Sequence, residues 1–392
     1  MQKWIGAQRE PAWLGVRRRE AGTAEADLEL PRWDRTDISG LDLAALRAPG
    51  GRIQVHLPPQ AAQAGVVAGE VSTLGPEHQE VAAAEFGRLV PVATGKLEAR
   101  NAALGRVVLV LVPAGVALEQ PIELVYELPS DPGAQLHTRT LVLLGRGAEA
   151  RLLQRTLGGT TRTRGQALAS AVVEARVGDG AQLQFMELQS WADGVYAFGQ
   201  RTAEVGRDAR VHWLLAELGG GLVRSGTRSV LGAIGGGALS QVVFFASGAQ
   251  HLDLLATMVH QGQRTDGLML AKGVVSGHGR SVYRGTSEIL RGAKGCNSQQ
   301  KENMLHLSPH ARSDAIPALF IKENEVQAGH AATTGKLDEE QLFYLASRGL
   351  PRREAERLVV QGFFAPLLER IPVPAVREAL VDLVDRKIDG EA

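Results

Sequence analysis

The chain has 392 residues, with 43 Lys and Arg against 43 Asp and Glu, and a single cysteine. A net charge of zero gives no general attraction to nucleic acid or anionic lipid, and no apolar run approaches the length of a membrane span. The first twenty residues lack the apolar centre of a secretory signal, and one cysteine allows no intrachain disulfide. Together these features predict a cytoplasmic protein that binds neither nucleic acid nor membrane.

Glycine is unusually frequent, at 46 of 392 residues, whereas aromatic residues make up only 5%. Average glycine usage is about 7%. A chain rich in glycine and aliphatic residues but poor in aromatic ones has many turns and thin, closely layered strands. This composition favours a repetitive β architecture over a helical bundle.

Residues 1–100 are expected to form a helical or irregular N-terminal region. Pro11 suits the start of a helix, and Trp13, Leu14 and Val16 follow it as a partial apolar face. The segment "RIQVHL" at 52–57 predicts a short strand, and "PEHQEVAAAEFGRLV" at 76–90 predicts a helical stretch.

Short β-type runs follow one another from about 106 to 330, and many of them alternate apolar and polar residues. A turn with Gly, Asp or Pro that leads to Ala and a new strand recurs irregularly, near 145, 178, 206, 235, 291 and 308. Few helical patterns separate the runs, which argues against a βαβ fold. A sandwich is one alternative, but stacked rungs that bury their apolar residues against each other fit better. We therefore expect a mainly β protein whose core, residues 101–332, is a right-handed parallel β-helix, that is, a single-stranded solenoid.

Residues 333–392 predict a C-terminal helical domain. Asp338 suits the N-cap of a first helix and Gly349 suits the position after its end. Pro351 suits the first turn of a second helix, and "VPAVREALVDLVDRKID" predicts a third. Helices at this end are expected to cap the last rung of the solenoid.

Three stretches carry a resemblance to a known family. They are 96–124, with "VPAGVALEQPIEL", 270–321, with "QQKENMLHLS" and "DAIPALFI", and 326–364, with "GHAATTGKLDEEQLFYLASRG". The chain resembles the SufB/SufD family of iron–sulfur cluster assembly scaffolds, and a weaker match lies at "EPAWLGVRRREA". It is more similar to the SufD branch, because SufB-type chains usually carry a cysteine shortly before the strand that matches "DAIP", and "SPHARSDAIP" contains none. SufD-type chains often carry a cysteine beside the later histidine. Here His330 is present and that cysteine is absent.

The resemblance implies a non-catalytic scaffold that pairs with a SufB-like subunit and docks a SufC-like ATPase through its C-terminal helices. Leu342, Tyr344, Arg348 and Gly349 lie in the stretch that matches the docking region. The resemblance also implies that an iron–sulfur cluster forms transiently at the interface with SufB, and that His330 is the contribution of this chain. No nucleotide-binding G-x-x-x-x-G-K-[ST] motif occurs, so ATP hydrolysis is expected only in the partner.

The residues themselves leave alternatives open. One cysteine and scattered histidines cannot enclose a cluster within this chain. His330 has a second interpretation as a loop imidazole near a helix start. Cys296 is a weak candidate for a metal ligand or sulfur acceptor with Lys294 beside it, and a small buried hydrophobe is the favoured interpretation. His278, His306 and His310 would cluster only if adjacent rungs bring them together.

Two other functions and one other assembly state are alternatives. A SufB-like chain that holds the cluster itself would need a cysteine-rich face. A polysaccharide-active β-helix enzyme would need a groove with clustered carboxylates, and secretion. Exposed β-helix edges would also let the isolated chain form a homodimer.

Overall fold

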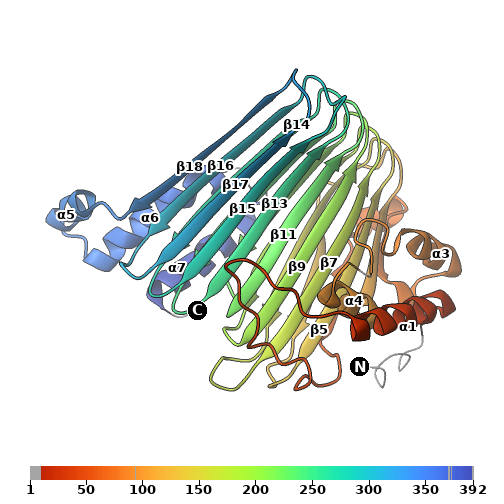
Figure 1. The fold of residues 1–392 in the computed structure, drawn as a ribbon, viewed down its shortest axis with the longest axis horizontal. Coiled ribbons are helices and arrows are strands. Elements are labelled where there is room, and N and C mark those ends of the chain that lie inside the picture. The colour runs from red at the N-terminus through yellow and green to blue at the C-terminus, as the bar shows by residue number, and fades with distance from the viewer. Residues whose placement is uncertain (1–9, 93, 370, 372, 391–392) are drawn as a thin grey trace.

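The computed structural model describes residues 10–92, 94–369, 371 and 373–390. Its core is a parallel β-solenoid made of two nine-stranded sheets (Figure 1). The strands from β3 to β18 alternate between the sheets, so each of eight rungs gives one strand to each sheet. One sheet has the order β1-β4-β6-β8-β10-β12-β14-β16-β18 and the other β17-β15-β13-β11-β9-β7-β5-β3-β2. The expected mainly β fold with a parallel β-helix is confirmed.

The solenoid strands are β3 (Arg106–Val112), β4 (Ile122–Leu128), β5 (Gln135–Leu144), β6 (Glu149–Gly158), β7 (Ala167–Val177), β8 (Gln182–Trp191), β9 (Val195–Val205), β10 (Arg210–Glu217), β11 (Leu222–Leu231), β12 (Gly237–Ala246), β13 (His251–His260), β14 (Asp266–Val275), β15 (Arg280–Ile289), β16 (Asn297–His306), β17 (Arg312–Ile321) and β18 (Gln327–Lys336).

Successive rungs pair in parallel and in register, so like positions stack. Since side chains alternate between the two faces of a strand, every second residue points into the solenoid. These inward columns form one large apolar cluster, in which Phe185 and Trp213 pack edge to face with ring centroids 5.4 Å apart. The burial of these columns between rungs is the main stabilising contact of the fold.

One turn recurs two residues before every even-numbered strand from β6 to β16. Gly147, Gly180, Gly235 and Gly295 occupy this position with φ between 67° and 72°. Each donates its backbone N–H to a carbonyl of the next rung, as Gly180 does to Arg207 at 2.7 Å. The left-handed region favours glycine, which explains the turn signature of the sequence. The signature is irregular because the turns before β10 and β14 place Asp208 and Arg264 there. In addition, the match near 308 lies in a turn that precedes an odd-numbered strand, β17.

The first end of the solenoid is closed. Strand β1 (Arg52–His56) pairs antiparallel with β4, and β2 (Val67–Glu70) pairs antiparallel with β3. The short helix α2 (Pro59–Gln63) and the residues after it add Ala61 and Val66 to the solenoid core, and a 3₁₀ turn, η2 (Val71–Thr73), follows. No free strand edge of the first rung remains among the described residues.

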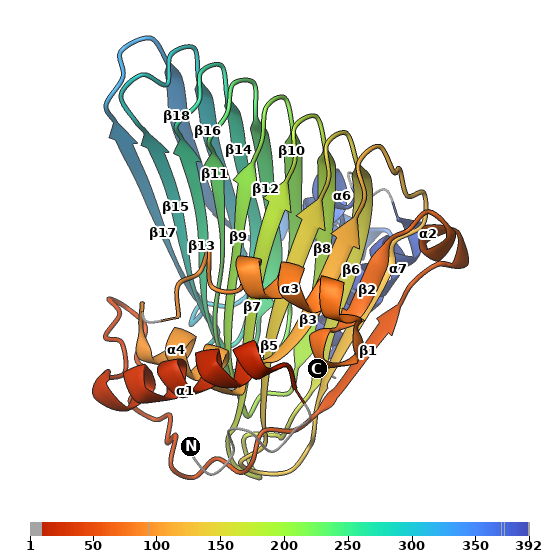
Figure 2. The ribbon, with the colours of Figure 1, turned by 90° about the vertical axis from the view of Figure 1, so that its right-hand side faces the viewer.

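Three N-terminal helices, α1 (Ala12–Asp27), α3 (Pro76–Glu85) and α4 (Lys96–Leu104), lie against the sheet of odd-numbered strands near this end (Figure 2). The predicted helix after Pro11, the strand at 52–57 and the helical stretch at 76–90 are confirmed as α1, β1 and α3. Helix α4 was not predicted. Asn101 fastens it by donating hydrogen bonds to the carbonyls of Thr138 and Ser170 on two neighbouring strands.

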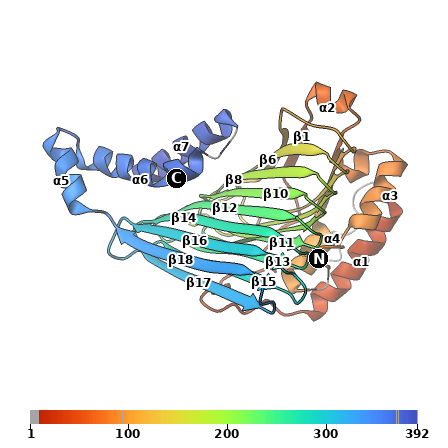
Figure 3. The same cartoon turned by 90° about the horizontal axis from the view of Figure 1, so that it is seen from above.

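The C-terminal helices α5 (Glu339–Ser347), α6 (Arg352–Leu368) and α7 (Pro374–Asp389) follow β18, which runs to Lys336, four residues beyond the boundary expected from sequence. Helices α6 and α7 lie along the outer face of the even-numbered sheet (Figure 3), where Phe364 and Leu380 join an apolar cluster with Leu214 and Phe245. The expectation that the helices cap the last rung is therefore wrong. Their apolar faces cover apolar residues on the outside of the sheet instead.

The turn ladder leads to a stability prediction. Arg264 adopts φ 53° where most equivalent turns have glycine, and the left-handed conformation costs an L-residue about 1–2 kcal/mol. Arg264→Gly should therefore raise the free energy of unfolding by about 1 kcal/mol, measured by chemical denaturation. Gly180→Arg, at the equivalent position with φ 68°, should lower it by a similar amount. If neither variant changes the free energy of unfolding measurably, the left-handed conformation of this turn does not contribute to stability.

Candidate functional site

The last rung leaves the solenoid open. Strand β17 pairs only with β15 and β18 only with β16. Most residues of both strands are half-buried or exposed, and Phe320 and Ile321 are 58% and 44% exposed. Unpaired strand edges beside exposed apolar side chains form a surface ready to pair with another chain. We call the end formed by β17 and β18 the open end.

His330 lies in β18 at this open end. It is exposed and sits in the middle of a strand, so the interpretation as a loop residue is wrong. The in-register pairing places it beside Gln300 of β16, whose side chain points into the solenoid and donates to Ser287 across the interior. Because equivalent positions of paired strands face the same way, His330 is on the inner face of the last rung.

Cys296 is buried directly beneath the last rung, immediately before the start of β16. Its Sγ donates to the carbonyl of Gly262 at 3.3 Å and lies 3.0 Å from the hydroxyl of Thr265, and Ile289 and Ala293 pack around it. The ammonium of Lys294 is engaged by Glu325 at 2.8 Å. Cys296 stacks on Val326, the residue before β18. Val326 is four positions before His330 in the chain, which corresponds to about 13 Å along the strand direction. The thiol and the imidazole therefore do not share one site.

The three other histidines of this region divide into two places. His278 and His310 occupy turns of successive rungs, and their rings stack with centroids 4.9 Å apart and planes 12° apart. His306 lies at the end of β16, where its Nε2 is 2.7 Å from the hydroxyl of Ser313. Among the described residues, no three His, Cys, Asp or Glu side chains come together as a metal site.

The residues expected to dock an ATPase lie on and just after α5, which projects beyond the last rung (Figure 1). Asp338 caps this helix by accepting from the backbone N–H of Glu340 at 2.9 Å, and Gly349 follows it with φ 92°, as predicted. Leu342 is buried, so its side chain is not part of the exposed surface.

The exposed apolar side chains of α5 are Phe343, at 76% exposure, and Tyr344, at 57%. The guanidinium of Arg348 lies over the Tyr344 ring, 5.2 Å from its centroid. Phe343 is thus exposed although its neighbour in the sequence, Leu342, is buried. Only the position of α5 relative to α6 shows that this ring is exposed.

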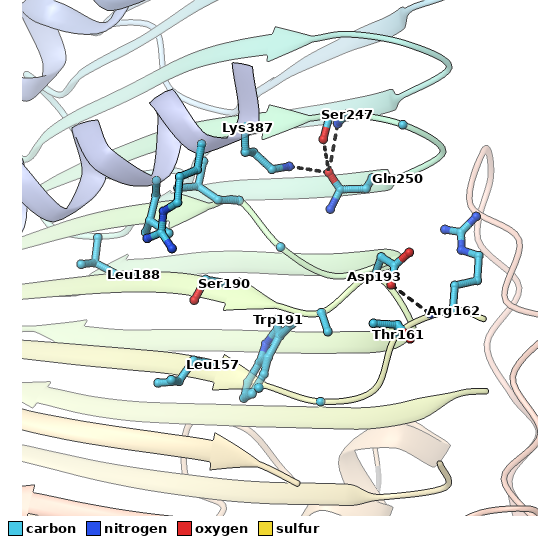
Figure 4. A pocket seen from close by; sticks show the side chains of 18 of the residues that line it. Leu157, Thr161, Arg162, Leu188, Ser190, Trp191, Asp193, Ser247, Gln250 and Lys387 are labelled. Atoms are coloured by element: carbon cyan, nitrogen blue, oxygen red, sulfur yellow. Dashed lines mark hydrogen bonds between the residues drawn. The ribbon is translucent and has the colours of Figure 1, made fainter. Parts of the chain in front are cut away.

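A separate cavity of about 1110 Å³ lies between α7 and the ends of the strands from β6 to β12 (Figure 4). Trp191 and Leu188 contribute apolar surface. Lys387 of α7 is buried beside it and donates to the carbonyl of Phe245 at 2.6 Å and to Gln250. Burial lowers the pKa of Lys387 to about 7.

Comparison with known proteins identifies the family. The model of the "SUF system FeS cluster assembly, SufBD core domain" family matches residues 128–363, which include every solenoid strand from β5 onwards, the last rung, α5 and most of α6. The chain belongs to the SufBD family. Proteins of this family take part in iron–sulfur cluster assembly by the Suf system, so the family expected from sequence is confirmed.

Individual relatives refine this result. The chain is 28% identical over 417 residues to the iron–sulfur cluster assembly protein SufD of Bacillus subtilis, covering 97% of this chain and 95% of that protein. It is 30% identical to a SufBD family protein of Staphylococcus epidermidis over 76% of this chain and 63% of the relative. A Mycobacterium leprae family member is 31% identical over 72% of this chain and 32% of its own length. The full-length match supports the prediction that this SufBD chain is most like SufD.

The comparisons with known proteins assign no residue roles. The structure adds two features that sequence analysis missed: the exposed ring of Phe343 beside the predicted Tyr344, and the inward side chains of β16 behind His330. The segment "SQQKEN" at 298–303 contained the second signal, because a strand with six successive polar residues places polar side chains on both of its faces. Which face points inward could be read only from the pairing. No helix of the described residues is long and apolar enough to cross a membrane.

The buried amine of Lys387 predicts a pH-dependent stability. Its pKa is about 7 in the folded protein and 10.5 when freely solvated. The unfolded chain therefore binds more protons between these values, so the folded state gains stability as pH rises from 7 to 10. Lys387→Met removes a penalty of about 4 kcal/mol at pH 7 and loses two hydrogen bonds of about 1 kcal/mol each. It should stabilise the protein by about 2 kcal/mol at pH 7 and not at pH 10.

Chemical denaturation at both pH values measures this difference. Lys322→Met, at an exposed lysine, is the control and should show the same small effect at pH 7 and pH 10. A stability difference between wild type and Lys387→Met that does not change with pH would contradict the assignment.

Proposed function

We propose that this chain is a non-catalytic, SufD-like scaffold subunit of a cytoplasmic Suf complex. It pairs with a SufB-like subunit through the open end of its β-helix and docks a SufC-like ATPase through α5. A nascent iron–sulfur cluster, as cargo, contacts His330 transiently at the shared interface. ATP hydrolysis belongs to the partner.

The observation that carries this proposal is the unfinished last rung. The first rung is covered by β1 and β2, which pair antiparallel with it and are the edge strands at that end, whereas β17 and β18 of the last rung have no such cover in the described part of the chain. A partner that presents its own strand edges here would continue both sheets by backbone hydrogen bonding. It would also cover Phe320 and Ile321, which are costly to leave in water. In the absence of the partner, the same edges allow two copies of this chain to form a homodimer.

The position of His330 supports a role at this interface. It is the imidazole that the last rung presents on its inner face, and it is exposed until a partner arrives. An imidazole is an occasional ligand of iron–sulfur clusters, whereas thiolates are the usual ones. The only cysteine of the chain is buried elsewhere. The thiolates must therefore come from the partner, which favours a shared cluster over a SufB-like chain that holds the cluster alone.

Coexpression with the SufB-like and SufC-like proteins of the same source tests this role. His330→Ala should leave the stoichiometry of the purified complex unchanged and lower its anaerobic iron–sulfur absorbance severalfold, because one ligand is lost. His310→Ala, at an exposed turn histidine of the preceding rung, is the matched control and should keep the absorbance. Failure of the wild-type chain to form a complex would contradict the scaffold proposal. An unchanged absorbance in His330→Ala would contradict the ligand role alone.

The α5 surface makes a second prediction. Aromatic side chains at the centre of an interface often contribute 1–2 kcal/mol or more to binding. Tyr344→Ala should therefore weaken binding of the SufC-like ATPase about tenfold or more, measured by calorimetry with the purified proteins. Glu340→Ala, at an exposed position of the same helix, should change the affinity less than twofold. Equal affinities of the wild type, Tyr344→Ala and Glu340→Ala for the ATPase would show that α5 is not the docking surface.

A further inference from the structure

The interior of the solenoid becomes polar just behind the open end. In β16 the inward side chains are Ser298, Gln300 and Glu302, followed by the apolar Met304, and in β15 they include Tyr283 and Ser287. Ser298 and Ser287 lie 2.8 Å apart, and Gln300 donates to Ser287 at 2.9 Å. These contacts show that the side chains of the two strands meet across the interior.

Glu302 has no partner in this interior. Its relative exposure is 2%, yet neither carboxylate oxygen accepts a hydrogen bond from any described residue. The other acidic residues inside the solenoid behave differently, because Glu187 is held by Arg201 at 2.6 Å and Glu217 lies 4.0 Å from the same guanidinium. Burying a carboxylate without a partner is costly, so such groups are normally paired or bind a metal.

Further unpartnered oxygens lie beside this carboxylate. Oε1 of Gln300 and the hydroxyl of Tyr283 are both buried, and neither makes a hydrogen bond to the described residues. The site therefore contains two carboxylate oxygens and one amide oxygen as unused acceptors, with a phenol beside them. Acceptors in this number are satisfied by a bound cation or by ordered water, because the described residues do not provide donors for them.

The two nearest acceptors point to the same space. A Cβ atom placed on Gly285 of β15 would lie 2.6 Å from Oε1 of Gln300 and 3.2 Å from Oε1 of Glu302. A side chain at this position would collide with Gln300, so the glycine lets both oxygens lie close to the backbone of β15. The last rung covers it only with small or compact residues, since Ala332 stacks on Glu302 and Pro317 stacks on Gly285.

His330 borders the same space from the last rung. Its partner in register is Gln300, and paired strands lie about 4.8 Å apart. An imidazole, a carboxylate and an amide oxygen therefore face the interior from neighbouring positions on two strands. Sulfur is absent from this set, because Cys296 is engaged elsewhere.

We propose that Glu302, Gln300 and His330 bind one divalent first-row cation, of the Fe²⁺ or Mn²⁺ class, inside the open end of the solenoid. Carboxylate and carbonyl oxygens suit Mn²⁺, and mixed imidazole and carboxylate sets suit Fe²⁺. A site without thiolate disfavours the softer ions. This site goes beyond the proposed function, since it lies within one chain and needs neither a partner subunit nor sulfide.

Titration of the purified full-length chain with Mn²⁺, with the free ion followed by electron paramagnetic resonance, tests the proposal. We expect one Mn²⁺ per chain, with Fe²⁺ competing under anaerobic conditions. Glu302→Gln keeps the shape of the side chain but removes its charge, and should weaken binding at least tenfold. His330→Ala should weaken it severalfold. Glu288→Gln, on the outward face of β15 where Glu288 pairs with Arg228, is the matched control and should bind as wild type.

Thermal unfolding provides the second readout. Added Mn²⁺ should raise the melting temperature of the wild type and of Glu288→Gln but not that of Glu302→Gln, because a ligand of the folded state stabilises it. Absence of stoichiometric Mn²⁺ binding, or equal binding by wild type and Glu302→Gln, would overturn the site. Full binding by His330→Ala would overturn the three-residue set. Loss of complex formation with intact Mn²⁺ binding would count against the proposed scaffold function alone.

Discussion

The structure depends on one constraint: the inward side chains of each rung are covered only by the rungs before and after it. In-register pairing from β3 to β18 stacks these side chains into continuous columns. Such a stack has two ends, and each end exposes apolar side chains and unpaired backbone groups unless something covers it. The first end is covered by β1, β2 and α2, which belong to the same chain. At the last end the described residues supply no cover, and this asymmetry is the basis for a function in assembly.

Buried charges show how the N-terminal region is held against the solenoid. Glu174 of β7 pairs with Arg139 of β5, and its carboxylate also accepts the backbone N–H groups of Gly87, Leu89 and Val90. A single buried acid thereby satisfies three donors of the segment after α3. An apolar residue at this position would leave those N–H groups without partners. The carboxylate of Glu174 is thus fully engaged, whereas that of Glu302 near the open end accepts no hydrogen bond from the described residues.

Local signals in the sequence were reliable where one residue acts on its own backbone. Asp338 caps α5 and Gly349 adopts a positive φ after it, as expected. The glycine turns before the even-numbered strands also follow from local conformation. The position of His330 was misjudged because "AGHAATTG" contains small residues that resemble a loop. It forms a strand because β16 offers a paired edge, and that edge comes from residues about thirty positions earlier in the chain.

The sequence by itself determined that the protein is a mainly β solenoid of the SufB/SufD type, because glycine-rich turns, alternating strands and the family motifs are all local patterns. Only the tertiary structure decided which side chains share the interior of a rung, which end stays open, and that α6 and α7 cover a sheet face. The physical reason is that every second residue of a strand points inward, and a shift of one position would exchange the two faces. Pairing between distant strands sets that register, so the placement of Glu302 behind His330 could not be read from either segment alone.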